Sequence, residues 1–258
     1  MSIVLNEYEW AEGAIESKDI GSKPVKTLDR VAKYYLARGY SKKDTRVLLE
    51  SFFLQSTGGP VTSSWSDLLD KIVKNAGKYP LIQVDGVSIS KKEMEIIETL
   101  DGSQLRRLAF TLLCIAKFKD IVSPLSNHWV KEPDREVMCM ANINTSVKRQ
   151  CLLFSQLRDA GLIKFAKRVD NLSVQVLFES PGDEAMFVSD FRNLGYQYMK
   201  YYGGQYMECE NCGITDKIRN PGKGRRQKYC PSCAAEIHTR QKVNSVMRKR
   251  DTLQENAC

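Results

Sequence analysis

Two Cys-x-x-Cys pairs near the carboxyl end constrain the fold of this chain more than any other feature. Cys209 pairs with Cys212 and Cys230 with Cys233, and 17 residues separate the two pairs. A structural zinc site needs four ligands in a tetrahedron, and each such pair brings two sulfurs to one point. We therefore predict one structural Zn²⁺ bound by these four cysteines. Four thiolates leave no position for a substrate, so the metal is expected to have no catalytic role.

Two alternatives to zinc remain open. A redox pair of the thioredoxin type uses a single Cys-x-x-Cys, but its βαβ surroundings are missing from this sequence. An iron–sulfur cluster can also take four cysteines. The segment between the pairs, ITDKIRNPGKGRRQKY, is rich in turn formers and cations. It cannot build a hydrophobic core alone, which favours a metal ion as the stabilising element.

The rest of the chain predicts a mainly α protein with small β elements. Residues 1–88 have the pattern of a helical N-terminal region. Apolar residues recur at helical spacing through residues 27–55, with a break at Gly39 and a new N-cap at Ser41. A further helix is predicted near residues 65–75, and Ser90 with Glu93 has the spacing of a capping box.

Residues 89–180 predict a winged-helix-like domain. Helices over 103–118, 135–141 and 147–160 are followed by two β-type segments, 162–169 and 172–178, joined by an Asp-Asn turn. In that order the third helix would be the recognition helix and the β-hairpin the wing. Many winged helices bind proteins instead of DNA, so that alternative also stays open.

Residues 185–258 predict a helix followed by a zinc ribbon with a basic tail. Residues 180–184, SPGDE, have the composition of a linker, and residues 187–202 continue in a helical pattern. The tyrosines of this last segment can stack on unpaired bases. Packing against the small zinc module is the preferred interpretation, because such modules need aromatic cover.

Positive charge is concentrated at the carboxyl end. The chain has a net charge of +8, and residues 209–258 hold 11 Lys or Arg against 5 Asp or Glu. Zinc-bound thiolates would offset about two of these charges. The asymmetry still indicates a polyanionic partner. Nucleic-acid contacts are predicted from the recognition helix, the wing, the zinc loop and the following helix, namely Lys148, Arg149, Arg158, Lys164, Lys167, Arg168, Lys217, Arg219, Lys223, Arg225, Arg226, Lys228, Arg240 and Lys242.

Several segments resemble uncharacterised winged-helix and zinc-ribbon proteins of bacteriophages and mobile elements in Gram-positive bacteria. DFRNLGYQYMKYYGGQYMECENCG, followed by KYCPSCA, carries the resemblance at residues 190–233. RLAFTLLCIAKF and VKRQCLLFSQLRDAGLI are similar to the same group, which extends the likeness to most of residues 25–240. The resemblance implies a phage or mobile-element context and no particular activity.

No enzyme motif is found in the sequence. The chain has no Walker loop, no Gly-x-Gly-x-x-Gly and no His-Glu-x-x-His, and its two histidines, His128 and His238, stand apart. We expect a non-catalytic protein that binds nucleic acid, with duplex DNA preferred, as a transcription regulator or replication factor. The alternative is an adaptor that binds a host protein such as RNA polymerase or a defence component.

The start of the sequence and its apolar runs bear on location. MSIVLNEYEWAEG has acidic residues where a secretory signal needs basic ones, and no apolar run approaches the roughly 20 residues of a membrane span. We therefore expect a cytoplasmic protein of the bacterial host cell with no membrane contact.

Overall fold

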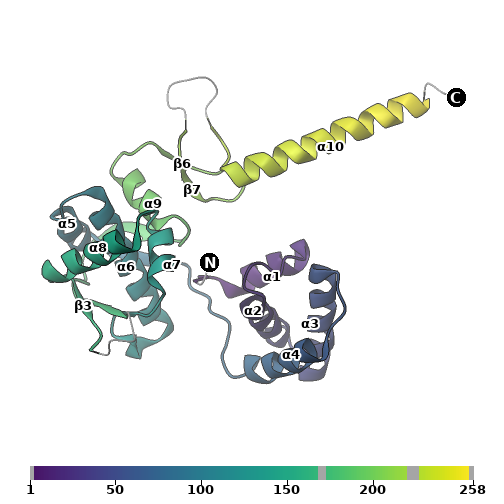
Figure 1. The fold of residues 1–258 in the computed structure, drawn as a ribbon, viewed down its shortest axis with the longest axis horizontal. Coiled ribbons are helices and arrows are strands. Elements are labelled where there is room, and N and C mark those ends of the chain that lie inside the picture. Colours follow the sequence, from purple (N-terminus) through teal and green to yellow (C-terminus); the bar gives the residue numbers. More distant parts are fainter. Residues whose placement is uncertain (1–2, 168–172, 220–226, 256–258) are drawn as a thin grey trace. The chain divides into compact units, whose positions relative to one another are not determined.

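A computed structural model describes residues 3–167, 173–219 and 227–255, with side chains described as far as residue 247. The prediction of a mainly helical chain with small β elements is confirmed (Figure 1). The chain forms two compact units. The first consists of Met1–Val87 with Phe118–Leu125, and the second of Ser88–Lys117 with Ser126–Cys258.

Four helices build the first unit, with α2 packed against the other three. Their apolar faces meet in one core, in which Leu28, Leu49 and Leu69 are fully buried. Ser41 caps α3 as predicted, because its Oγ accepts a hydrogen bond from Asp44 N at 3.1 Å. The helices are α1 (Glu7–Ser17), α2 (Pro24–Ala37), α3 (Lys42–Thr57) and α4 (Ser63–Ala76).

A long apolar helix forms the core of the second unit. In α6 (Ser103–Val122), every residue from Leu112 to Ala116 is apolar or cysteine and fully buried. The strand β1 (Val87–Ser90) and the helix α5 (Lys91–Glu98) precede α6. The predicted capping box at Ser90 and Glu93 is present, so the start of α5 was predicted correctly.

A three-stranded sheet and two helices follow α6. After a short 3₁₀ turn (Pro124–Ser126), the chain forms β2 (Trp129–Val130), α7 (Asp134–Met140), α8 (Val147–Asp159), β3 (Ile163–Phe165) and β4 (Val174–Val176). The strand order is β2-β4-β3, with β4 antiparallel to both neighbours. The predicted turn at Asp170 and Asn171 lies outside the described residues.

The prediction of a linker at residues 180–184 was wrong. The backbone N–H of Ser180 donates to Glu93 Oε1 at 2.9 Å, and Lys91 N donates to Asp183 O at 2.8 Å. Glu93 is completely buried and also accepts from Ser90 N at 2.7 Å and Lys117 Nζ at 2.9 Å. This buried carboxylate therefore fixes the segment to α5 and α6.

The helix predicted over residues 187–202 is shorter than expected. Its first part forms β5 (Glu184–Val188), which pairs with β1, and only Leu194–Tyr201 is helical, as α9. The run of apolar residues was too short to distinguish a strand from a helix by its periodicity. Phe187 therefore lies on a strand, and Phe191 is buried in the connection to α9.

Candidate metal centre and nucleic-acid interface

The four cysteines come together as a cluster that can hold a metal ion. One sulfur from each of Cys209, Cys212, Cys230 and Cys233 lies within 4.8 Å of the others. The sulfurs of Cys212 and Cys230 are 3.8 Å apart. A tetrahedron with Zn–S bonds of about 2.3 Å has edges of about 3.8 Å, so this donor set and its spacing fit Zn²⁺.

A small hairpin and a helix position the four sulfurs. The first pair lies in the turn between β6 (Tyr206–Glu208) and β7 (Thr215–Lys217), which are antiparallel. This turn is closed by Gly213 N donating to Cys209 O at 2.9 Å. The second pair lies at the start of α10 (Pro231–Glu255), where the positive end of the helix dipole favours thiolates.

Backbone donors favour the ionised form of Cys209. Burial raises the pKa of this thiol, but N–H groups of Cys230, Cys212 and Asn211 outweigh burial and lower the pKa to about 6. The hydrogen bond from Cys230 N to Cys209 Sγ is 3.3 Å long. Such N–H to sulfur contacts prepare a thiolate for a metal, because the thiolate is the form that binds.

The apolar cover of the cysteines is thin. Met207 is buried with three of the cysteines, and Ile214, Ile218 and Tyr229 pack around them while partly exposed. A core of this size does not stabilise a module alone, so a bound metal would supply much of its folding free energy.

The cysteine module consists of the β6–β7 hairpin and the four clustered cysteines. Residues just before and within α9 contact this module directly. Arg192 Nη2 donates to Cys212 O at 2.6 Å, and Asn193 Nδ2 donates to Thr215 O at 2.9 Å. The rings of Tyr196 and Tyr206 pack with centroids 5.0 Å apart. Tyr196 thus packs on the module, as the preferred interpretation of the sequence held, whereas Tyr198 on the same helix packs against Phe110 of α6 with ring centroids 5.4 Å apart.

The same helix contacts the turn that precedes α8. Asn142 Oδ1 accepts from Tyr196 N at 3.1 Å, and Arg107 Nη1 donates to Asn142 O at 2.9 Å. Gly195 lies so close to this turn that a Cβ atom there would be 2.0 Å from Ala141 O. Only glycine permits that approach. The cysteine module, α9 and the turn that precedes α8 are therefore connected by direct contacts.

The predicted contacts on α8 divide into free and paired cations. Lys148 and Arg149 are exposed on the first turn, and within the described part of the chain neither has an ion-pair partner. They line a shallow hollow of about 460 Å³ together with Leu152. Arg158 is paired with Asp159 at 2.7 Å, and its guanidinium lies 5.6 Å from the ring of Phe165.

The remaining predicted contacts are spread over the hairpins and α10. Lys228 is exposed but paired with Glu210 at 3.2 Å. The others that the structure describes are exposed on β3, on β7 and its continuation, or on α10, namely Lys164, Lys167, Lys217, Arg219, Arg240 and Lys242. Four predicted contacts lie outside the described residues, namely Arg168, Lys223, Arg225 and Arg226.

The sequence analysis did not predict a pocket that lies beside α9. Asp190, Gln197 and Lys200 line one pocket with Phe187 and Tyr201. The short run Met186–Val188 was the available signal, because an apolar run after Pro-Gly also fits a strand. Without that strand, no sequence pattern brings Phe187 next to α9.

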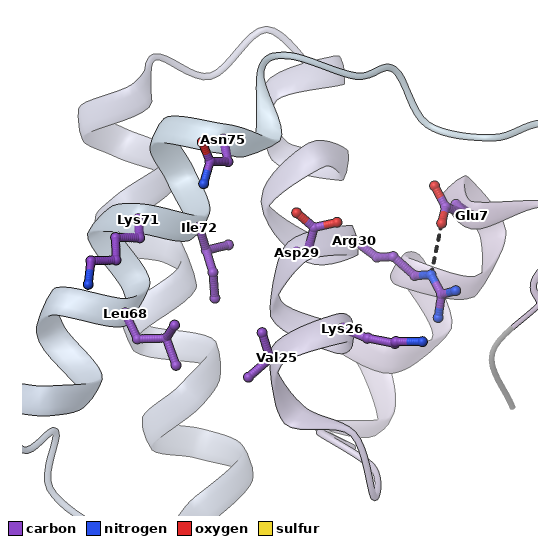
Figure 2. Close-up of a pocket in the computed structure, with 9 residues that line it drawn as sticks. All are labelled: Glu7, Val25, Lys26, Asp29, Arg30, Leu68, Lys71, Ile72 and Asn75. Atoms are coloured by element: carbon purple, nitrogen blue, oxygen red, sulfur yellow. Dashed lines mark hydrogen bonds and ion pairs between the residues drawn. The ribbon is translucent and has the colours of Figure 1, made fainter. Parts of the chain in front are cut away.

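A groove of about 590 Å³ lies between α2 and α4 of the first unit. Figure 2 shows Val25 on α2 facing Leu68 and Ile72 on α4 across this groove. Near one end, Arg30 Nε contacts Glu7 Oε1 at 2.9 Å in a buried ion pair. The lining also includes two exposed lysines, Lys26 and Lys71.

Comparison of this chain with protein-family models, with curated proteins and with solved structures finds no match. Among the described residues, no helix has the length and apolar character needed to cross a bilayer.

Proposed function

We propose that this protein binds duplex DNA without catalysing a reaction, and that one structural Zn²⁺ holds its C-terminal module. The observation that carries the proposal is the arrangement around α8. The chain runs through α6, β2, α7, α8, β3 and β4, and the sheet order is β2-β4-β3. A winged helix has this order, and its third helix enters the major groove. Here that helix presents two exposed cations at its start, and neither has an ion-pair partner among the described residues.

Each element has a distinct role in the proposed complex. Lys148 and Arg149 on α8 reach base edges or adjacent phosphates in the groove. Lys164 on β3 and Lys167 just after it act as the wing's phosphate contacts. Lys217 and Arg219 on the zinc ribbon add sequence-independent affinity through counterion release. Arg158 and Lys228 contribute less, because each already has a carboxylate partner.

The cellular role follows from the resemblance to proteins of phages and mobile elements. We infer a transcription regulator or replication factor that acts in the cytoplasm of a bacterial host. A winged helix joined to a basic zinc module suits either role, because both need a protein that holds a DNA site and leaves the DNA chemically unchanged.

Fluorescence anisotropy of the zinc-loaded protein tests the proposal with random duplex, single-stranded DNA and RNA over a salt series. We expect duplex binding that weakens steeply with salt. The double variant Lys148→Ala with Arg149→Ala should lower the salt slope by about two and weaken binding. Lys43→Ala, an exposed lysine on α3, is the matched control and should leave both quantities unchanged. Absence of duplex binding at low salt would refute the proposal.

The groove between α2 and α4 favours a second candidate, an adaptor that binds a host protein such as RNA polymerase or a defence component. An apolar floor with lysines at its rim suits an acidic amphipathic helix. Leu68 lines this groove (Figure 2). If the groove binds the partner, the immobilised protein should capture one host protein in a 1:1 ratio from nuclease-treated lysate, and Leu68→Glu should abolish that capture. Leu54→Glu on α3 is the control, because Leu54 is exposed and lies outside the groove lining.

A further inference from the structure

A pocket of about 410 Å³ lies among β5, α9 and the β6–β7 hairpin, within the second unit. This volume falls in the range of small-molecule pockets, about 300–1,000 Å³. Among the described residues, its lining includes none of the cations of the proposed DNA contact and none of the four cysteines. The lining residues that matter here are Phe187, Asp190, Gln197, Lys200, Tyr201 and Thr215.

Two aromatic rings are available at this pocket. Phe187 on β5 is 50% exposed and Tyr201 on α9 is 47% exposed, although large aromatic side chains normally bury most of their surface. The two rings come from different elements, β5 and α9. Exposed rings that line a pocket provide stacking surfaces for a planar ligand.

A buried amide offers one fixed hydrogen-bond acceptor. Gln197 is only 8% exposed. Its Nε2 donates to Asp190 O at 2.6 Å and to Arg192 O at 3.0 Å, which fixes the orientation of the amide. Within the described part of the chain, nothing donates to its Oε1. Among the described residues, Oε1 is not one of the fully buried polar atoms without a partner, so a ligand N–H can reach this oxygen and donate to it.

The charges at the pocket are balanced. Lys200 pairs with Glu208 at 2.6 Å, and Arg192 pairs with Asp190 at 2.7 Å. Paired carboxylates do not favour a metal ion or a free phosphate as the main ligand. The pocket thus combines stacking surfaces, an acceptor to which no described residue donates, and little net charge. A neutral heteroaromatic ring with N–H donors would match these features.

We propose that this pocket takes one unpaired nucleobase that carries an exocyclic amino group. The base stacks on Phe187 and Tyr201, and its amino group donates to Gln197 Oε1. This inference rests on the proposed nucleic-acid binding and adds to it, since it assigns a site for a base that has left the stack or lies at a strand end. A base outside the duplex stack exposes its ring faces and its pairing edge to such a site.

NMR of the full-length, zinc-loaded protein with ¹³C-methyl methionine tests the site directly. Met186 lines the pocket and reports locally, and Met186→Leu assigns its signal. Titration with deoxyadenosine or deoxycytidine to millimolar concentration should shift this signal, and 3-methylthymidine, whose base has no N–H donor, should bind more weakly. An unmoved Met186 signal, or equal binding of 3-methylthymidine, would overturn the proposal.

Variants separate stacking from general effects. Phe187→Ala with Tyr201→Ala should weaken nucleoside binding by at least about tenfold, the scale of one lost stacking contact. Tyr79→Ala, which removes an exposed tyrosine of the first unit, should not change binding. Equal affinity of the double variant and the unchanged protein would overturn the stacking role. Circular dichroism verifies that the double variant folds.

The outcome for the pocket is independent of the outcome for duplex binding. A shift of Met186 without duplex binding in the anisotropy assay would leave the pocket assigned and refute the proposed function. Duplex binding that depends on Lys148 and Arg149, with Met186 unmoved by nucleosides, would support the proposed function and overturn the pocket.

Discussion

Asn142 Nδ2 donates a hydrogen bond to Asn193 Oδ1 at 2.9 Å, and both residues have a left-handed backbone with φ of 54°. Asparagine tolerates this conformation better than most residues do. Asn142 lies between α7 and α8, and Asn193 precedes α9 and also donates to Thr215 O in the cysteine module. Two turns that are far apart in the sequence are therefore joined by one side-chain contact.

Replacing Gly195 tests the close approach of α9 to the α7–α8 turn. In Gly195→Ala the new Cβ would meet the backbone at Ala141, so the helix must move. We expect a loss of about 2 kcal/mol or more in the free energy of unfolding. Gly13→Ala in α1 is the control, because a Cβ there meets nothing within 4 Å. Urea denaturation should show this control to be more stable by about 0.5–1 kcal/mol.

Loss of one cysteine ligand should release the metal. In Cys230→Ser the fourth thiolate is replaced by a poor zinc ligand. We expect zinc content below one ion per chain by elemental analysis, together with rapid proteolysis of the module and no change in the first unit. Cys139→Ser is the control, because Cys139 is exposed on α7 and away from the cluster. Full zinc content in Cys230→Ser would contradict the assignment.

Thiol labelling should distinguish three classes of cysteine. Cys139 and Cys151 are exposed and should react with iodoacetamide in the native protein. The four clustered cysteines should react only after chelation, because bound zinc occupies their sulfurs. Burial raises the pKa of the Cys114 thiol, so this residue should react only in denaturant. Peptide mass spectrometry measures each site, and labelling of Cys209 at the rate of Cys139 would argue against a metal.

The buried carboxylate of Glu93 should be important for stability. Glu93→Gln keeps the size of the side chain but leaves Lys117 without its charge partner. We expect a loss of about 3 kcal/mol in the free energy of unfolding, the scale for breaking a buried pair. Glu95→Gln on the exposed side of α5 is the control and should change stability by less than about 0.5 kcal/mol. Equal effects of the two changes would mean that the buried pair is not stabilising.

Local signals in the sequence were reliable because they depend on neighbouring residues. Ser41 and the pair Ser90 and Glu93 predicted helix starts, since a cap acts within one turn. The two Cys-x-x-Cys pairs predicted their own clustering, because sulfur spacing limits the possible geometry. These signals predicted two helix starts and the clustering of the four cysteines.

Contacts between distant segments could not be predicted in this way. The strand β5 pairs with β1, and nothing in either short segment specifies the other. The strand β2 has only two residues, which is too short for a periodic pattern. The partner of Lys228 is Glu210, which lies on the other side of the loop and reaches it only on folding, so a count of cations overstated the number that are free to contact DNA. Asp159, the partner of Arg158, is its neighbour in the sequence and was visible there.

The pairing of β1 with β5 also determines when the second unit can finish folding. A ribosome releases β1, α5 and α6 long before Glu184–Val188 is made. Until then β1 has no strand partner and Glu93 lacks its hydrogen bond from Ser180, so the unit is incomplete throughout much of its synthesis. Pairing between such distant segments slows folding. A fragment that ends at residue 179 would keep this nascent state permanently, with an open strand edge at β1.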